Sequence, residues 1–220
     1  MGVSFKRIRL REREQSPGEE IANSVSHAVA GAVAIVAAVF LIMTAVERGS
    51  TRSIVGSSVF AATMVFLYLS STLYHALRPN RAKRVFKILD HSAIFLLIAG
   101  TYTPFTLGVL RGTLGWTLLV AVWVLAVSGV IFTAVSRIRY PTVFTLTVLA
   151  MGWLIVVAVK PLWAQMAPWG LFWLGMGGLA YTGGIVFFAA DRIRFGHLVW
   201  HICVIIGTAC HYVAVLRYSG

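Results

Sequence analysis

Two histidines stand four residues apart in the segment HLVWH, at positions 197 and 201. In a helix, residues i and i+4 lie on one face, so His197 and His201 can point at the same object. Imidazole nitrogens are common ligands of zinc and other transition metals. The first histidine is not followed by glutamate, so the segment differs from the HExxH helix of metalloproteases, whose glutamate acts as a base. The pair therefore predicts a metal site of another kind.

The elements that carry these histidines are strongly apolar. The chain has 220 residues, of which 59% are hydrophobic and 12% are charged, far less polar than a soluble domain. Seven uncharged stretches reach at least 20 residues each, about the length of helix that crosses a bilayer core. Backbone groups cannot stay unpaired in lipid, so each stretch is expected to be a helix. We predict an all-α integral membrane protein, a bundle of seven transmembrane helices.

The expected organisation is a polar N-terminal tail over residues 1–20 and one membrane domain over residues 21–217. The predicted spans are 21–46, 53–77, 87–110, 112–136, 140–159, 169–190 and 195–217.

Positive charge orients this bundle. Residues 1–20 and the connections after the second, fourth and sixth spans carry 14 of the 19 Lys and Arg residues. Such an excess marks the cytoplasmic side, so we expect the N-terminus in the cytoplasm and the C-terminus outside. The same flanks account for the net charge of +12, so nucleic acid is not an expected partner. The expected partners are membrane lipids, including a fatty acyl chain within the bundle.

Polar side chains gather at the cytoplasmic end of the predicted helices. His75, Asp90 and His197 each lie three residues inside the basic residue that borders its span. Three residues of helix rise about 4.5 Å, so these side chains share one depth. Ser71 and His201 lie one turn deeper, on the same faces as His75 and His197. Three converging imidazoles suit zinc and leave a fourth position for water, as in catalytic zinc sites, and Asp90 would hold that water or orient a ligand.

The first span begins at the same end with EEIANSVSH, which brings polar residues toward the site. Among them His27 lies about one turn too deep for a ligand and is a candidate for contact with the ligands. Two other histidines are given structural roles. His91 points about 100° away from Asp90 around its helix, and His211 lies about 15 Å beyond His201.

The segments EEIANSVSH, SSTLYH, LDHSAIFLLIAGTYTPF and HLVWH resemble the hemolysin III branch of the progestin and adipoQ receptor family, which is related to the alkaline ceramidases. The resemblance covers roughly residues 18–217. It implies one zinc ion as cofactor, held by His75, His197 and His201 near the cytoplasmic end of the bundle.

The resemblance also implies roles for other residues. Ser71 and His75 match the family's S-x3-H motif, and Asp90 matches its aspartate that contacts the zinc-bound water. Glu20 and Asn23 match the motif of the first helix, and we expect them, with His27, to lie behind the ligands. The short segment before the first span favours the bacterial branch, and hence a multi-pass protein of the bacterial plasma (inner) membrane.

Three functions are considered. The first is a zinc-dependent membrane hydrolase that cleaves a lipid amide or ester through a metal-bound water, with Asp90 and Ser71 as catalytic residues. The second is a non-catalytic sensor or regulator of lipid or membrane state, in which zinc clamps the helices together. The third is direct cytolysis, suggested by the family name and opposed by the seven apolar spans, which need a membrane from the start. We favour the first.

Overall fold

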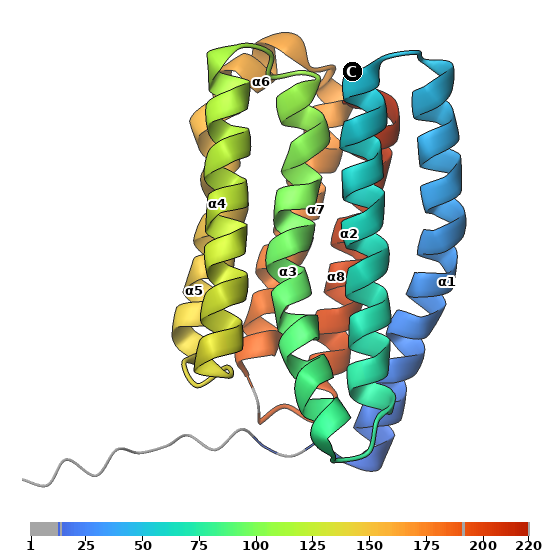
Figure 1. Ribbon diagram of the computed structural model, residues 1–220, viewed down its shortest axis with the longest axis vertical. Coiled ribbons are helices and arrows are strands. Elements are labelled where there is room, and N and C mark those ends of the chain that lie inside the picture. The colour runs from blue at the N-terminus through green and yellow to red at the C-terminus, as the bar shows by residue number, and fades with distance from the viewer. Residues whose placement is uncertain (1–12, 14, 191, 220) are drawn as a thin grey trace, which may run out of the picture.

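Every regular element in residues 13, 15–190 and 192–219, the part of the chain that the computed structural model describes, is a helix (Figure 1). The elements are α1 Pro17–Glu47, α2 Thr51–Ala76, α3 Arg81–Leu107, α4 Thr113–Ser136, α5 Pro141–Gly152, the 3-10 helix η1 Trp153–Ala158, α6 Val159–Gln165, α7 Pro168–Ala189 and α8 Gly196–Tyr218. With α5, η1 and α6 taken as one span, seven segments of the described chain are long and apolar enough to cross a membrane. The prediction of an all-α seven-helix bundle is confirmed.

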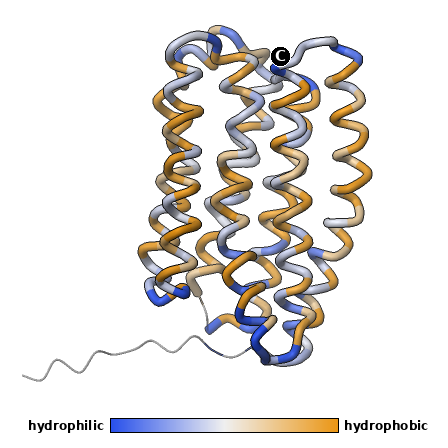
Figure 2. The backbone as a smooth tube through the Cα atoms, in the orientation of Figure 1, coloured by the Kyte–Doolittle hydropathy of each residue, from blue (hydrophilic) through white to orange (hydrophobic). Residues whose placement is uncertain are grey.

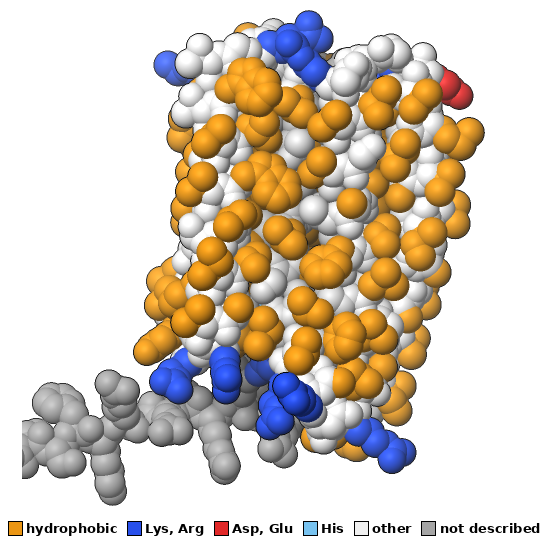
Figure 3. Space-filling view, viewed as in Figure 1, with side chains coloured by type: hydrophobic (Ala, Val, Ile, Leu, Met, Phe, Trp, Pro, Cys, Tyr) orange, Lys and Arg blue, Asp and Glu red, His pale blue; other side chains and the backbone are white. Residues whose placement is uncertain are grey.

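The surface of the bundle follows the same division between apolar sides and basic ends. Figure 2 shows hydrophobic residues along the helices and hydrophilic residues at their ends. On the face in Figure 3, Lys and Arg lie at the two ends of an otherwise apolar wall. The start of α1 and the α2–α3, α4–α5 and α7–α8 connections lie at one end, which is the end expected in the cytoplasm (Figure 1).

Helix α1 begins inside the segment 1–20 that the sequence analysis assigns to a polar tail. Ser16 is its N-cap and forms a capping box with Glu19, and Pro17 follows at the first helical position. Both features favour helix initiation, because the cap satisfies free backbone N–H groups and proline already has a helical φ. Residues 17–20 are therefore helical. The first part of the predicted tail, residues 1–12 and 14, lies outside the described residues.

The fifth span departs most from the expected segment 140–159. It runs from Pro141 to Gln165, because a lysine near a membrane surface can extend its charged end to water and Lys160 does not end the helix. Within the span, η1 replaces α-helix with 3-10 geometry. The hydroxyl of Tyr102 on α3 donates to Gly152 O (2.8 Å) and accepts from Ile155 N (2.7 Å). Tyr102 thus pairs backbone groups at the break, as lipid requires.

The helices are arranged so that α1 bridges the two helices that carry the histidines. Helix α1 packs along both α2 and α8, whereas α2 and α8 contact each other little. Helix α3 lies between α2 and α4, and α7 packs along α8. The fifth span makes few contacts with α4 or α7. The bundle is therefore tightly packed around the histidines and loosely packed beside the fifth span.

Candidate metal centre

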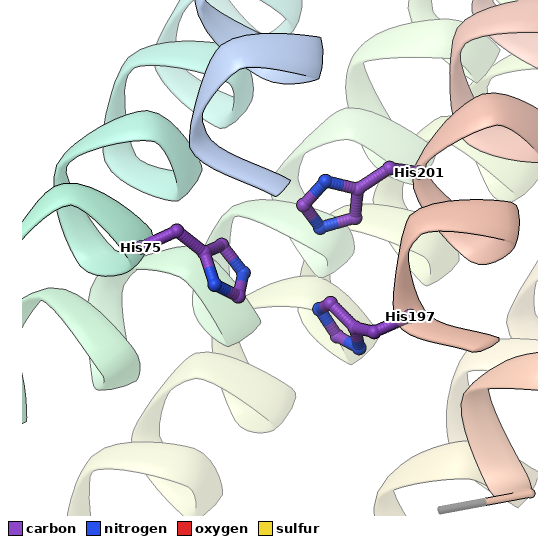
Figure 4. Close-up of side chains that lie close together, drawn as sticks. All are labelled: His75, His197 and His201. Atoms are coloured by element: carbon purple, nitrogen blue, oxygen red, sulfur yellow. The ribbon is translucent and has the colours of Figure 1, made fainter. Parts of the chain in front are cut away.

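Three imidazoles converge at the end of the bundle that is expected in the cytoplasm (Figure 4). His75 comes from the last turn of α2, and His197 and His201 come from the first turns of α8 (Figure 4). Each ring offers one nitrogen, and the three nitrogens lie within 4.8 Å of one another. His75 and His201 are buried, and His197 is partly buried. The group could hold a metal ion.

His75 is oriented by a carboxylate. Its Nδ1 lies 2.7 Å from Glu20 Oε2, and since an ionised carboxylate only accepts, Nδ1 is the donor. The other nitrogen, Nε2, is then an acceptor, and it is buried with no hydrogen-bond partner among the described residues. The Nε2 atom of His197 is likewise buried with no hydrogen-bond partner among the described residues. A bound cation would satisfy both orphaned nitrogens, and carboxylate–histidine pairs are the usual arrangement behind a metal ligand.

His201 is held by helix α1. Its Nδ1 lies 3.3 Å from the backbone oxygen of Asn23 and 3.2 Å from Ser26 Oγ. A carbonyl oxygen only accepts, so this contact assigns the Nδ1 proton and leaves Nε2 as the nitrogen that faces the cluster. Asn23 thus serves His201 through its backbone, while its side-chain amide donates to Gln15 Oε1 (2.5 Å). Ser26 is not among the site residues that the sequence predicts.

His27 lies against the cluster. Its ring stacks on that of His201, with centroids 3.6 Å apart and an angle of 7° between the planes. The ring of Tyr68 also packs edge-on against the ring of His27, with centroids 5.1 Å apart. Both nitrogens of His27 are buried and have no hydrogen-bond partner in the described part of the chain. The contact with a ligand is therefore made through the face of the ring.

Asp90 and Ser71 line a small cavity beside the histidines. Its volume is about 10 Å³, and its walls include His197 and His201. Such a space is about the size of one water molecule. Ser71 is fully buried, and its hydroxyl has no partner among the described residues. Asp90 lies outside the group of three histidines that could hold a metal ion.

His91 lines the same cavity, although the sequence analysis assigns it to a helix contact. Its Nδ1 lies 2.9 Å from Lys87 O, and its ring packs on Phe144 with centroids 5.3 Å apart. His91 therefore lines the cavity and also contacts a neighbouring helix. Although it points about 100° away from Asp90 around α3, it can still reach the edge of the same cavity. Only the placement of α5 and α7 around α3 reveals this.

A second cavity of about 300 Å³ adjoins the small one. The two share four wall residues, namely Leu67, Ile94, Trp200 and Val204. The larger cavity extends between α3, the fifth span and α7, and its lining is almost entirely apolar. Gly175 and Gly178 form part of the wall, and a Cβ added at either would meet no atom within 4 Å. An apolar chamber thus lies next to the polar end of the bundle.

Comparison with known proteins agrees with this picture. A family model described as "Haemolysin-III related" matches residues 16–212. The chain is similar to a hemolysin-3 homolog of Bacillus subtilis, with 46% identity over 200 residues, which are 91% of this chain and 94% of the relative. It is also similar to hemolysin-3 of Bacillus cereus, with 44% identity over 91% of each chain.

A more distant relative is human. The monocyte to macrophage differentiation factor of Homo sapiens is 28% identical over 170 residues, which are 73% of this chain and 68% of the relative. The seven apolar helices and these matches confirm a multi-pass membrane protein. The chain belongs to the haemolysin III-related family.

Proposed function

We propose that this protein is a zinc-dependent membrane hydrolase that cleaves an amide or ester bond of a lipid. The observation that carries the proposal is one juxtaposition. Three imidazole nitrogens within 4.8 Å of one another share a small cavity with Asp90 and Ser71, and that cavity adjoins an apolar chamber.

The donor set fits zinc. Nitrogens around a tetrahedral zinc ion at 2.0–2.1 Å lie about 3.3 Å apart, so the observed spacing within 4.8 Å needs only small ring movements. His75, His197 and His201 would hold the ion. When bound, zinc makes water acidic enough to ionise near neutral pH and polarises a carbonyl. The hydrogen bonds that His75 donates to Glu20 and His201 donates to the backbone oxygen of Asn23 keep both rings in the tautomers that leave Nε2 free.

A metal held by the three histidines would keep a fourth position for an exchangeable ligand. No fourth His, Cys, Asp or Glu of the described residues joins the three histidines as a ligand. A purely structural clamp, as in the sensor hypothesis, would be expected to close its coordination sphere with a fourth protein ligand. The three-ligand arrangement supports a catalytic role over that alternative.

Asp90 and Ser71 supply the remaining polar groups. The Asp90 carboxylate would take the proton of the attacking water and return it to the leaving nitrogen or oxygen. The Ser71 hydroxyl, buried without a partner among the described residues, would donate to the oxygen that gains negative charge. Both side chains line the small cavity, which is about the size of the attacking water.

The larger cavity would hold the acyl chain of the substrate. Its lining carries no Asp, Glu, Lys or Arg, so an acyl chain could enter it from the equally apolar bilayer core without displacing a charged group. The walls shared by the two cavities would place the first carbons of the chain beside the histidines. The lipid head group would then lie at the cytoplasmic mouth.

The test uses the full-length protein purified in detergent. We expect about one zinc per chain, release of fatty acid from lipid amides or esters, and a loss of at least about 100-fold in rate for Asp90→Asn with zinc retained. Glu47→Gln makes the same carboxylate-to-amide change at an exposed position near the opposite end of α1 and should leave the rate unchanged. A zinc-loaded protein that leaves ceramides, N-acyl amines and lipid esters intact would overturn the proposal.

A further inference from the structure

Two adjacent carboxylates in the first turn of α1 reach toward different sides of the histidine cluster. Glu20 accepts from His75 Nδ1 on α2 through Oε2 and from Lys83 Nζ on α3 through Oε1, at 2.7 and 2.9 Å. Glu19 accepts from the backbone N–H of Phe195, the N-cap residue of α8, at 2.8 Å. The first turn of α1 is therefore hydrogen-bonded to α2, to α3 and to the N-cap residue of α8.

Lys83 supports His75 through two neighbours. Its ammonium group is paired with Glu20, and the same group lies 5.0 Å from the centroid of the Tyr74 ring, within the range of a cation–π interaction. Tyr74 in turn packs on His75, with ring centroids 4.5 Å apart. The Lys83 side chain is only 15% exposed, so solvent weakens these contacts little. Lys83 thus restrains both groups that touch the outer side of His75.

Glu19 supports the start of α8. It is buried, and besides Phe195 N it accepts from Ser16 N at 2.9 Å and from Arg13 Nη1 at 3.0 Å. Phe195 has a φ of 57°, a left-handed conformation that side chains other than glycine rarely adopt. His197 follows two residues later. The Glu19 contact therefore holds the backbone turn that directs the first ligand of α8 toward the site.

These bonds matter because the two ligand-bearing helices do not hold each other. Helices α2 and α8 contact each other little, and α1 packs along both. The distance from His75 to His197 then depends on how each helix is attached to α1. At the cytoplasmic end, those attachments are the Glu20 and Glu19 hydrogen bonds.

We infer that Glu19 and Lys83 are positioning residues of the metal centre, Lys83 acting through Glu20 and Tyr74 on His75, and Glu19 acting through the Phe195 amide on His197. The inference rests on the proposed metal binding by the three histidines. It assigns no contact with the metal or substrate to either residue.

The test measures metal binding by the full-length protein in detergent. Zinc affinity is obtained by competition with a chelator, and ligand geometry from the visible spectrum of the cobalt-loaded protein. Lys83→Met should weaken zinc binding about tenfold, the lower end of the effect of residues behind metal ligands, and should alter the cobalt spectrum. Lys83→Arg, which keeps the charge for Glu20 and Tyr74, should recover most of the affinity.

Arg84→Met is the matched control, because it removes an exposed positive charge from the next residue of the same turn. Exposed charges contribute little, so its zinc affinity should stay within about twofold of the parent protein. Glu19→Leu should weaken zinc binding about tenfold. Glu19→Gln keeps an oxygen acceptor for Phe195 N–H and should bind close to normally, which separates this contact from the ion pair with Arg13.

The outcomes distinguish the inference from the proposed function. Parent protein that binds neither zinc nor cobalt would overturn the proposed function, and the inference with it. Parent protein that binds metal, with Lys83→Met and Glu19→Leu equal to it in affinity and cobalt spectrum, would overturn the inference alone. A loss of affinity in Lys83→Met that Arg84→Met reproduces would also overturn it, since general charge would then be the cause.

Discussion

The rings of His27 and His201 lie face to face, 3.6 Å apart between centroids and 7° from parallel. The stack joins α1 to α8 beside the ligating nitrogens. Because the contact is made by the ring face, it restrains the rotation of His201 about its side-chain bonds without occupying its nitrogens. A histidine one turn from the expected depth thus contacts one of the three clustered histidines.

The stack predicts a difference between two substitutions of His27. His27→Ala leaves His201 free to rotate and should weaken zinc binding about tenfold, whereas His27→Phe keeps a flat ring against His201 and should retain most of the affinity. Chelator competition measures both. Equal weakening in the two variants would show that the His27 nitrogens, and not its ring face, serve the site.

Removal of a ligand should abolish stoichiometric zinc. His201→Ala should reduce bound zinc from about one ion per chain to near zero, since two imidazoles hold zinc poorly compared with three. His211→Ala is the matched control: this histidine is on the same helix, contacts Leu174 O at 3.3 Å, and lies about 15 Å farther along it. Metal analysis of the purified proteins gives the answer. If His211→Ala lost its zinc and His201→Ala kept it, the metal would not be bound at the three histidines.

If the protein is the proposed hydrolase, filling the apolar cavity should shorten the acyl chain that it accepts. Gly178→Leu places a side chain in the cavity wall, where an added Cβ meets no atom within 4 Å. Long-chain substrates should lose at least about tenfold in rate, because the added side chain occupies space that their distal methylenes would fill, while short-chain substrates and zinc content should be unaffected.

Gly183→Leu is the control for this experiment. Gly183 is exposed on the same helix, and a Cβ there also meets no atom within 4 Å, but the residue does not line the cavity. A chain-length profile measured across saturated substrates should match that of the parent protein. If Gly178→Leu leaves the profile unchanged as well, the acyl chain lies elsewhere.

Tyr102 should contribute to stability through its hydroxyl. Tyr102→Phe unpairs Ile155 N and Gly152 O at the break in the fifth span and should cost about 1–3 kcal/mol, seen as a lower Tm in detergent. Tyr140→Phe removes the hydroxyl of an exposed tyrosine in the α4–α5 connection and should leave Tm unchanged. An unaltered Tm in Tyr102→Phe would mean that water or lipid replaces the bond.

Much of the architecture follows from local features of the chain. A bilayer demands that each apolar segment satisfy its own backbone, so seven long uncharged stretches predict seven helices without knowledge of their neighbours. The spacing of His197 and His201 places both on one face of α8 for the same local reason. The common depth of His75, Asp90 and His197 comes from counting residues inward from the basic borders.

The details that complete the site are set by contacts between helices. Ser26 and the backbone oxygen of Asn23 reach His201 only because α1 lies between α2 and α8 with one particular rotation about its axis. The same rotation lets Glu20 join Lys83 to His75. Hydrophobic periodicity is a weak guide to that rotation when lipid and protein interior are both apolar.

The fifth span shows the same difference between what the sequence predicts and what helix packing decides. Its apolar composition predicts a helix, but the 3-10 break appears where Tyr102 of another helix pairs the backbone groups. The chain by itself therefore determined how many helices cross the membrane and how deep the histidines lie, because both depend on local length and spacing. The tertiary structure decided which side chains orient the histidines and where the apolar chamber opens, because those depend on how whole helices pack.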